Sequence, residues 1–328
     1  MLNLTQYIKE IGRGKDGARD MTEQQAYELF GAMLDGGVPD LELGAILIAL
    51  RVKSESDDEL RGFFRAAEQR LIRLEKPSGK VAPVILPSYN GARHQANLTP
   101  LLALLLQRFK VPVLIHGPLE GMGRTGTATI LRELGVLPSV TLARAQEAIH
   151  RDGLAFLPTQ VIAPGLNNLL ALRQRLGVRN SAHSLVKMID PFAGDSLRLV
   201  SVSHPDYLVK MRDFFAGTDT SVLLLRGTEG EAFANPKRRP QLEWLHAGRQ
   251  ELLFEAEVGP IATLPKLPES IDASTTAHWI RAALCGQAPL PTPIVNQLAC
   301  CLYASGYASD MNQAKAIVAV ETGSLAAA

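Results

Sequence analysis

Apolar residues over positions 4–75 recur at the three- and four-residue spacing that is typical of amphipathic helices. The segment MTEQQAYELFGAMLDG shows this spacing after its second residue, Thr22, which can cap a helix N-terminus. Two further helical patterns follow before the sequence PSGK at 77–80 breaks the periodicity. We therefore expect a small all-helical domain over residues 1–76.

Beyond residue 81 the pattern changes to short, apolar runs that alternate with helical segments. Runs of this length and composition are typical of parallel strands that are buried on both faces. They occur at 81–86, 111–117, 197–203 and 221–227. Strands that alternate with helices after an all-helical start predict a larger α/β domain over residues 77–328, beside the small N-terminal helical domain.

Composition places the chain among ordinary globular proteins, with 46% hydrophobic and 20% charged residues. No apolar run approaches the roughly 18 residues that a membrane-spanning helix needs, and residues 1–20 lack the order of a signal peptide. Cys285, Cys300 and Cys301 have neither a zinc-site spacing nor the arrangement of a disulfide framework. We expect a cytoplasmic protein with no membrane partner.

The net charge of +1 excludes a uniformly basic nucleic-acid binder, so any phosphate-binding surface must come from local clustering. Residues 160–250 contain 12 Lys and Arg against 8 Asp and Glu, although the rest of the chain is net acidic. A two-fold axis would double such a patch into a groove of phosphate contacts. A charge run usually marks a solvated face, and this alternative remains open at the level of sequence.

The segment ILPSYNGARHQANLTP, at 85–100, carries an expected strand through a loop into an apolar helix. A helix N-terminus offers free N–H groups and a positive dipole end to an anion, and Arg93 and His94 lie beside it here. A phosphate-cradling turn usually contains several glycines, whereas this loop contains Gly91 alone. The loop is therefore either a modified anion site or a plain turn between strand and helix.

A second glycine-bearing loop follows the expected strand 111–117, which ends with His116 and Gly117. Ligands of α/β sheets bind outside the carboxyl ends of the strands, where both loops should lie. We therefore expect the two loops to border one pocket.

The order of these features resembles that of anthranilate phosphoribosyltransferase over nearly the whole chain. The resemblance rests on the helical start, the first turn, the pair HG on the next strand, and the stretches GRTGTATILRELG and RQRLGVRNSAHSL. More specifically, YNGARHQANLTPLLALLL, GVRNSAHSL, SVSHPDY, GTEGEAFANP and ACCL resemble the YbiB family, homologues of the transferase that bind nucleic acid. The resemblance implies a nucleoside-phosphorylase/phosphoribosyltransferase-like fold, a helix at about 165–188 that completes the helical domain, and a homodimer formed through that domain.

Several motifs of the transferase are altered in this chain. Its phosphoribosyl-pyrophosphate turn, Gly-Thr-Gly-Gly-Asp, is PSYNG at 87–91, and its Lys-His-Gly-Asn motif is IHGP at 115–118. Its adjacent Asp-Glu pair, which holds magnesium, has no adjacent counterpart, since Glu229 and Glu231 are separated. Arg173 matches the arginine that contacts the aromatic acid. The resemblance thus implies a vestigial substrate pocket, formed by Tyr89, Asn90, Gly91, His116, Gly117 and Arg173.

Together these features predict a non-catalytic homodimer that binds DNA or RNA without strong sequence preference, with no catalytic residue and no cofactor or metal. The cations expected to contact phosphates are Lys187, Lys210, Arg212, Lys237, Arg238, Arg239 and Arg93. The alternative is a phosphoribosyltransferase that acts on an altered aromatic substrate and uses Mg2+ with phosphoribosyl pyrophosphate. A third hypothesis is a protein-interaction scaffold whose old cleft is structural.

Overall fold

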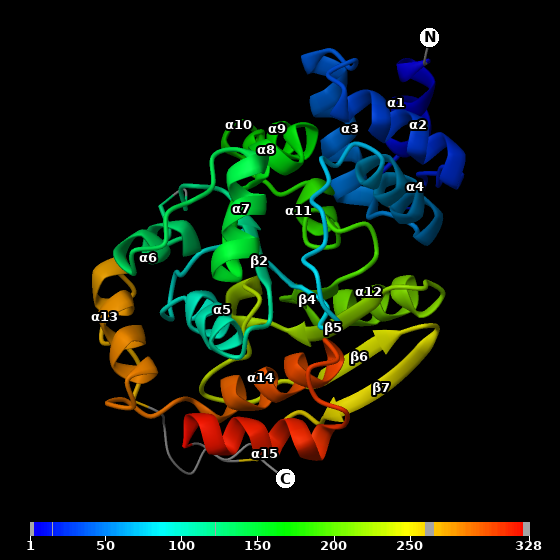
Figure 1. The fold of residues 1–328 in the computed structure, drawn as a ribbon. Helices are drawn as coiled ribbons and strands as arrows, with labels where there is room; N and C mark the ends of the chain where they lie inside the picture. The colour runs from blue at the N-terminus through cyan, green and yellow to red at the C-terminus, as the bar shows by residue number, and fades with distance from the viewer. Residues whose placement is uncertain (1–2, 15, 122, 260–265, 324–328) are drawn as a thin grey trace. The chain divides into compact units, whose positions relative to one another are not determined.

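The computed structural model describes residues 3–323, except 15, 122 and 260–265 (Figure 1). Its internal contacts divide the chain into two compact units. The helical unit contains Met1–Arg73 and Thr159–Pro191, and the α/β unit contains Leu74–Pro158 and Phe192–Ala328. The first boundary thus lies at Arg73 rather than at 76, and the returning segment extends beyond the expected 165–188 on both sides.

The helical unit is built from two segments of the chain. The first forms α1 (Leu4–Ile11), α2 (Glu23–Leu34), α3 (Asp40–Lys53) and α4 (Asp57–Glu68); the second forms α8 (Thr159–Ile162), α9 (Pro164–Ala171), α10 (Arg173–Leu176) and α11 (Ala182–Leu185). At the start of α2, the side chain and backbone of Thr22 exchange hydrogen bonds with Gln25 in a capping box. The amphipathic faces of α2 and α4 pack together, and the rings of Phe30 and Phe63 stack 4.7 Å apart.

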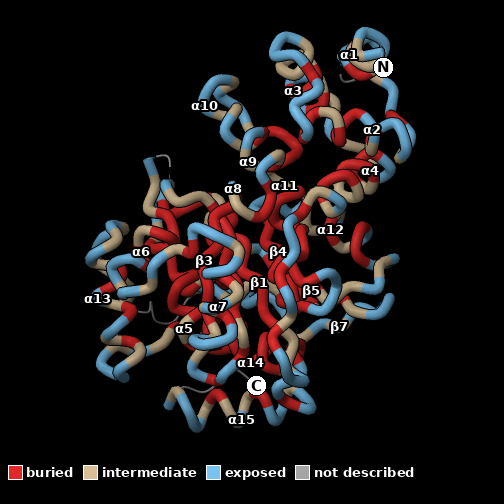
Figure 2. Tube along the Cα trace, turned by 45° about the horizontal axis from the view of Figure 1, so that its top comes forward, coloured by how far each residue is buried: buried red, intermediate tan, exposed pale blue. Residues whose placement is uncertain are grey.

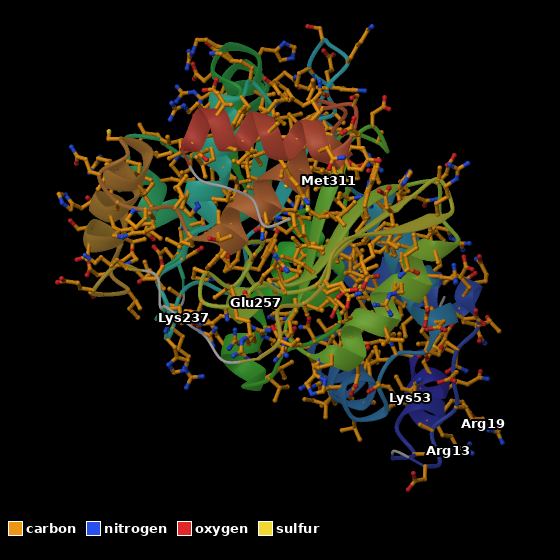
Figure 3. All side chains as sticks on the ribbon, turned by 90° about the horizontal axis from the view of Figure 1, so that it is seen from below. Arg13, Arg19, Lys53, Lys237, Glu257 and Met311 are labelled. Atoms are coloured by element: carbon orange, nitrogen blue, oxygen red, sulfur yellow. The ribbon has the colours of Figure 1, made fainter. Side chains whose placement is uncertain are left out.

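A buried ion pair links the end of α3 to the start of α4. Lys53 Nζ donates to Glu59 Oε2 at 2.7 Å, and the two side chains are 5% and 0% exposed. Glu59 also accepts hydrogen bonds from the backbone N–H groups of Met21 and Ser56, at 3.0 and 2.8 Å. Asp20 is a second partner of Lys53, which is labelled in Figure 3. These contacts take the place of water around charges that would otherwise be costly to bury.

The described part of the α/β unit contains a seven-stranded sheet in the order β3–β2–β1–β4–β5–β6–β7. The first five strands of this order, β3, β2, β1, β4 and β5, are parallel to one another. Strand β6 is antiparallel to β5, and β7 is antiparallel to β6. Their bounds are β1 (Val84–Pro87), β2 (Val113–Gly117), β3 (Leu154–Pro158), β4 (Leu197–Val202), β5 (Ser221–Arg226), β6 (Leu242–His246) and β7 (Arg249–Phe254). The strands β1 to β4 are buried throughout, as mostly apolar runs predict, although β2 carries His116 and β4 carries Arg198 and Ser201 (Figure 2).

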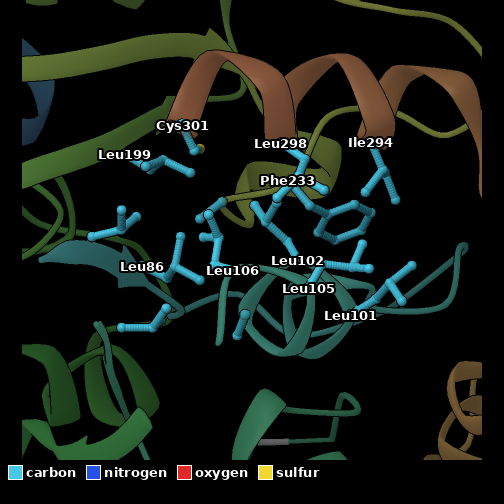
Figure 4. Close-up of a cluster of buried hydrophobic side chains, with 14 of the residues drawn as sticks. Leu86, Leu101, Leu102, Leu105, Leu106, Leu199, Phe233, Ile294, Leu298 and Cys301 are labelled. Atoms are coloured by element: carbon cyan, nitrogen blue, oxygen red, sulfur yellow. The ribbon is translucent and has the colours of Figure 1, made fainter. Parts of the chain in front are cut away.

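Helices cover this sheet and enclose its core. They are α5 (Thr99–Arg108), α6 (Thr127–Glu133), α7 (Leu142–Asp152), α12 (Pro205–Ala216), α13 (Ala273–Leu284), α14 (Thr292–Ala304) and α15 (Met311–Thr322), with the 3-10 turn η1 (Thr228–Gly230). Leu86 of β1, Leu102 of α5 and Leu298 of α14 belong to one hydrophobic cluster (Figure 4). Phe233, from the segment after β5, lies between α5 and α14 in this cluster and anchors that segment. No helix in the described residues is long and apolar enough to cross a membrane.

The antiparallel hairpin of β6 and β7 was not predicted from the sequence. A two-residue turn joins His246 to Arg249, and its residues Ala247 and Gly248 both have positive φ, 46° and 69°. Such turns usually carry Asn or Asp followed by Gly, because Gly has no Cβ and the short polar side chains of Asn and Asp tolerate positive φ by hydrogen-bonding locally. With Ala247 in the first position, the usual sequence signal of a hairpin is missing.

Replacing Lys53 with Met should strongly destabilise the helical unit, because the carboxylate of Glu59 then remains buried without its cation. We expect the free energy of unfolding to fall by about 3 kcal/mol, measured by chemical denaturation. Arg65→Met is the matched control, since Arg65 forms a more exposed ion pair with Glu23 and should change this free energy by less than about 1 kcal/mol. Equal losses in the two variants would contradict this account of the buried pair.

Candidate functional site

The loop that follows β1 lies at the carboxyl edge of the sheet, with β2 and β4 on either side. Ser88 N donates to the carbonyl of His116 at 2.9 Å, and Ala92 forms a β-bridge with Thr125 of the loop that follows β2. Gly117 permits this approach, since an added Cβ would lie 2.0 Å from the Ser88 carbonyl oxygen. The two loops therefore lie together, as predicted from the direction of the strands.

The carboxylate of Glu231 fills the inner part of the loop after β1. Its Oε1 accepts hydrogen bonds from the backbone N–H groups of Asn90 and Gly91, at 2.6 and 2.8 Å. Its Oε2 accepts from the hydroxyl groups of Ser88 and Thr99. Because Glu231 is 1% exposed, these four donors take the place of water around a buried charge.

The carboxylate of Glu229 fills the outer part of the same loop. It accepts hydrogen bonds from three consecutive backbone N–H groups, those of Arg93 at 2.9 Å and of His94 and Gln95 at 2.8 Å. The side-chain amide of Asn90 donates to the Glu229 carbonyl at 2.9 Å, so each segment binds the other. Glu229 itself has φ 53° and ψ 19°, a left-handed conformation that is unfavourable for a residue with a side chain.

The segment that carries both acids is held in place by α14. Gln297 of α14 is fully buried; its Oε1 accepts from Ala234 N at 2.7 Å, and its Nε2 donates to the Ala232 carbonyl at 2.9 Å. Phe233, between these two residues, is inserted into the hydrophobic core. Packing and hydrogen bonds thus fix the backbone immediately after Glu231.

These contacts satisfy the backbone donors of the turn after β1. Backbone N–H groups that converge on one point after a strand are the means by which such turns bind a phosphate. Here five of them, from Asn90, Gly91, Arg93, His94 and Gln95, bind carboxylates of the same chain. The turn retains an anion, but that anion is part of the protein.

Glu229 and Glu231 do not fit a magnesium site. A magnesium ion needs oxygen ligands in near-octahedral positions around one point, usually supplied by carboxylates, water and substrate phosphates. Both acids are directed instead at N–H and O–H donors. Within the part of the chain that the structure describes, no group of three or more His, Cys, Asp or Glu side chains could hold a metal ion.

Tyr89 and His116 form a polar pair beside this turn. The Tyr89 hydroxyl and His116 Nδ1 are 2.7 Å apart and share a hydrogen bond in which either group can donate. His116 is fully buried, and burial lowers its pKa to about 3. The imidazole is therefore neutral near pH 7 and supplies no positive charge to an anion.

Arg173 lies in the helical unit, at the start of α10, whereas the other expected pocket residues lie in the α/β unit. Burial, followed by the positive charges of Arg179, Arg173 and Lys187, lowers the pKa of His183 to about 3. Lys187 is 8% exposed, which leaves little of its surface for contact with a phosphate.

The expected cations of the α/β unit differ in their surroundings. Lys237, which is labelled in Figure 3, and Arg238 are exposed. The Arg238 guanidinium donates to the Gly259 carbonyl at 2.8 Å. Arg239 is half-buried, with its guanidinium 5.0 Å from the ring centroid of Phe254. Two of these three consecutive cations therefore face solvent, and the third packs on an aromatic ring.

Arg212 has a structural role in place of the expected free cation. Its guanidinium donates to both carboxylate oxygens of Glu243, at 2.8 and 2.6 Å, and Glu243 is buried. This pair holds α12 against β6. Lys210 is half-buried on the same helix, and Arg93 is exposed on the loop after β1.

Comparison with known proteins shows the family to which the chain belongs. Residues 5–70 match the family model described as glycosyl transferase family, helical bundle domain. The protein YbiB of Escherichia coli strain K12 is 45% identical over 312 residues, which are 95% of this chain and 97% of that protein. The chain belongs to the YbiB family. This YbiB-family chain is also 28% identical to anthranilate phosphoribosyltransferase of Saccharolobus islandicus strain L.S.2.15 over 260 residues, 79% of this chain and 74% of the enzyme.

Solved structures share the fold of this YbiB-family chain. The crystal structure of anthranilate phosphoribosyltransferase from Thermus thermophilus has a TM-score of 0.75 at 21% identity and covers 98% of this chain and 94% of its own. The Saccharomyces cerevisiae enzyme in complex with PRPP and Mg has a TM-score of 0.72 at 14% identity, over 98% and 93% of the two chains. The predicted fold class, a small helical domain with a larger phosphoribosyltransferase-like α/β domain, is confirmed.

The sequence did not reveal that Glu229 and Glu231 are the partners of the turn after β1. Both acids lie in the stretch GTEGE, whose glycines permit a tightly folded loop. An added Cβ on Gly227, for example, would lie 2.0 Å from the Glu231 carbonyl oxygen. The sequence signal that was available is the presence of two acids, Glu229 and Glu231, in a glycine-bearing loop after a strand. That loop should lie at the same edge of the sheet as the turn after β1.

The neutral, buried His116 should make the protein sensitive to acid. Its pKa is about 3 in the folded protein and about 6.5 in the unfolded chain, so between these values the unfolded state binds the extra proton. Stability is therefore complete above about pH 6.5 and falls as the pH is lowered toward 3, by up to about 1.4 kcal/mol per pH unit for this group.

Chemical denaturation at a series of pH values measures this slope, with His116→Asn as the comparison. The asparagine keeps a polar atom near Tyr89 but does not titrate, so the variant should lose part of the acid sensitivity. An unchanged slope in the variant would show that His116 is not a source of this sensitivity.

Proposed function

We propose that this member of the YbiB family is a non-catalytic homodimer that binds DNA or RNA through phosphate contacts, without strong sequence preference. One observation carries the proposal. At the carboxyl edge of the sheet, the carboxylates of Glu229 and Glu231 occupy the donors of the turn after β1, whereas cations nearby remain exposed to solvent. A diphosphate would have to displace Glu229 and Glu231 from donors whose hydrogen bonds contribute about 1.5–3 kcal/mol each. Transferase chemistry with phosphoribosyl pyrophosphate is disfavoured for this reason.

Exposed cations support the binding part of the proposal. Lys237 and Arg238 follow β5, and Arg93 follows β1, so all three belong to segments at the carboxyl edge of the sheet. Long basic side chains that meet phosphates release condensed counterions and carry no information about base sequence. Binding should therefore be steeply dependent on salt and tolerant of sequence.

An exposed apolar stripe supports the homodimer. Leu41, Ile48 and Val52 of α3 are 81%, 40% and 54% exposed and lie at helical spacing on one face, with Gly44 and Ala45 between them. Large apolar side chains on one helix face are unfavourable in water unless another surface covers them. A second copy is the proposed occupant, because the same face on both partners is self-complementary around a two-fold axis.

Removal of two exposed cations should weaken binding and reduce its dependence on salt. For Lys237→Ala/Arg238→Ala we expect the slope of log affinity against log salt to become shallower by about 1–2. Fluorescence anisotropy with a labelled short single strand and a duplex measures this slope. The matched control is Arg108→Ala/Lys110→Ala, which removes two exposed cations at the C-terminal end of α5, at the opposite edge of the sheet.

An equal loss in the control would show that net charge, and not this segment, determines binding. No binding of the unmodified protein at low salt would contradict the proposal. Calorimetric titration with phosphoribosyl pyrophosphate and Mg2+ then tests the transferase alternative.

A charge placed in the apolar stripe should separate the homodimer. Ile48→Asp buries a carboxylate in the proposed contact, so sedimentation velocity should show a dimer for the unmodified protein and a monomer for the variant. Leu137→Asp, at a residue of the α/β unit that is 74% exposed, should leave the dimer intact. A monomeric unmodified protein, or a dimer that persists in Ile48→Asp, would contradict the proposed interface.

A further inference from the structure

We propose that Glu229 is a built-in ligand of a phosphate-binding nest, and that removing its carboxylate opens the nest to an external phosphate or diphosphate group. The nest consists of the backbone N–H groups of Arg93, His94 and Gln95. This inference concerns a site within the α/β unit and does not rest on nucleic-acid binding.

The geometry of the nest is that of an anion site. Three consecutive N–H groups reach one carboxylate at 2.8–2.9 Å, the distance of charge-assisted hydrogen bonds. Consecutive N–H groups that converge in this way form a concavity that favours negative charge. The exposed side chains of Arg93 and His94 extend from the same residues and would add positive charge beside an incoming anion.

The two acids of the turn differ in how firmly they are held. Glu231 is buried and is bound by both N–H and O–H donors, so it forms part of the core. Glu229 is half-buried and adopts a left-handed backbone conformation, which costs free energy unless its contacts compensate. Those compensating contacts are the three N–H groups of the nest. Glu229 is therefore the acid whose removal leaves an accessible site.

The chemistry of the donors indicates the class of ligand. The nest offers only N–H donors, so it selects an anion with several acceptor oxygens, and a phosphate group has three. In the unmodified protein the carboxylate is attached to the chain and is present at a high effective concentration, so a free phosphate cannot compete. Glu229 thus acts as an autoinhibitory group for anion binding at this turn.

The experiment compares thermal unfolding of Glu229→Ala with and without inorganic pyrophosphate, at ionic strength matched with KCl. Without the ligand, we expect the midpoint to lie below that of the unmodified protein, because three donors lose their acceptor. Pyrophosphate at ten times its dissociation constant should raise the midpoint of the variant by about 3 °C and leave the unmodified protein unchanged. Broadening of the pyrophosphate 31P resonance should occur with the variant alone.

Two controls separate the nest from general charge effects. Glu257→Ala removes an exposed acid that accepts from the backbone N–H of Arg239 at 3.1 Å, and it should show no response to pyrophosphate (Figure 3). Glu229→Gln retains an acceptor oxygen in the nest and should also show none. If Glu229→Ala does not fold by itself, its refolding yield with pyrophosphate, compared with KCl, provides the same test.

The proposal is overturned if the variant neither binds pyrophosphate nor is rescued by it. It is also overturned if the unmodified protein or Glu257→Ala binds pyrophosphate as tightly as the variant.

Discussion

Charge-assisted hydrogen bonds between two glutamate side chains and one backbone turn hold the carboxyl edge of the sheet together. Glu231 reaches a turn that lies 141 residues earlier in the chain, and Glu229 binds the next part of that turn. The loops after β1, β2 and β5 are positioned through these contacts and through the packing of Phe233. The buried carboxylate of Glu231 is stable there because two backbone N–H groups and two hydroxyl groups donate to it.

The same contacts complete the turn after β1 with groups of the protein itself. Converging N–H groups repel one another and need a negative partner. In this chain the partner is supplied by a neighbouring loop, so the turn is complete in the folded protein itself. The architecture shared with anthranilate phosphoribosyltransferase is therefore compatible with a different role for its sheet edge.

Those features that depend on local sequence could be predicted. The cap at Thr22 and the apolar strands follow from residues that are neighbours in the chain, and the strand order brings the two loops to one edge. The partners of Glu229 could not be predicted, because they are brought together only by the folded sheet. Arg212 was expected to be free for the same reason: its partner Glu243 lies on a hairpin whose turn begins with Ala247 and lacks the usual signal.

The interleaved course of the chain has a consequence for biosynthesis. The helical unit needs α9, which packs against α2, and Ile72 N donates to the Ile162 carbonyl at 2.9 Å. A ribosome that has released the first segment has therefore delivered only part of that unit, and the strands β1 to β3 emerge before the remainder arrives. The α/β unit is likewise incomplete until α14 is synthesised, because Gln297 of α14 holds the segment after Glu231. Each unit is therefore completed only by a segment that emerges later, so apolar surfaces of both remain open on the nascent chain and favour binding by chaperones.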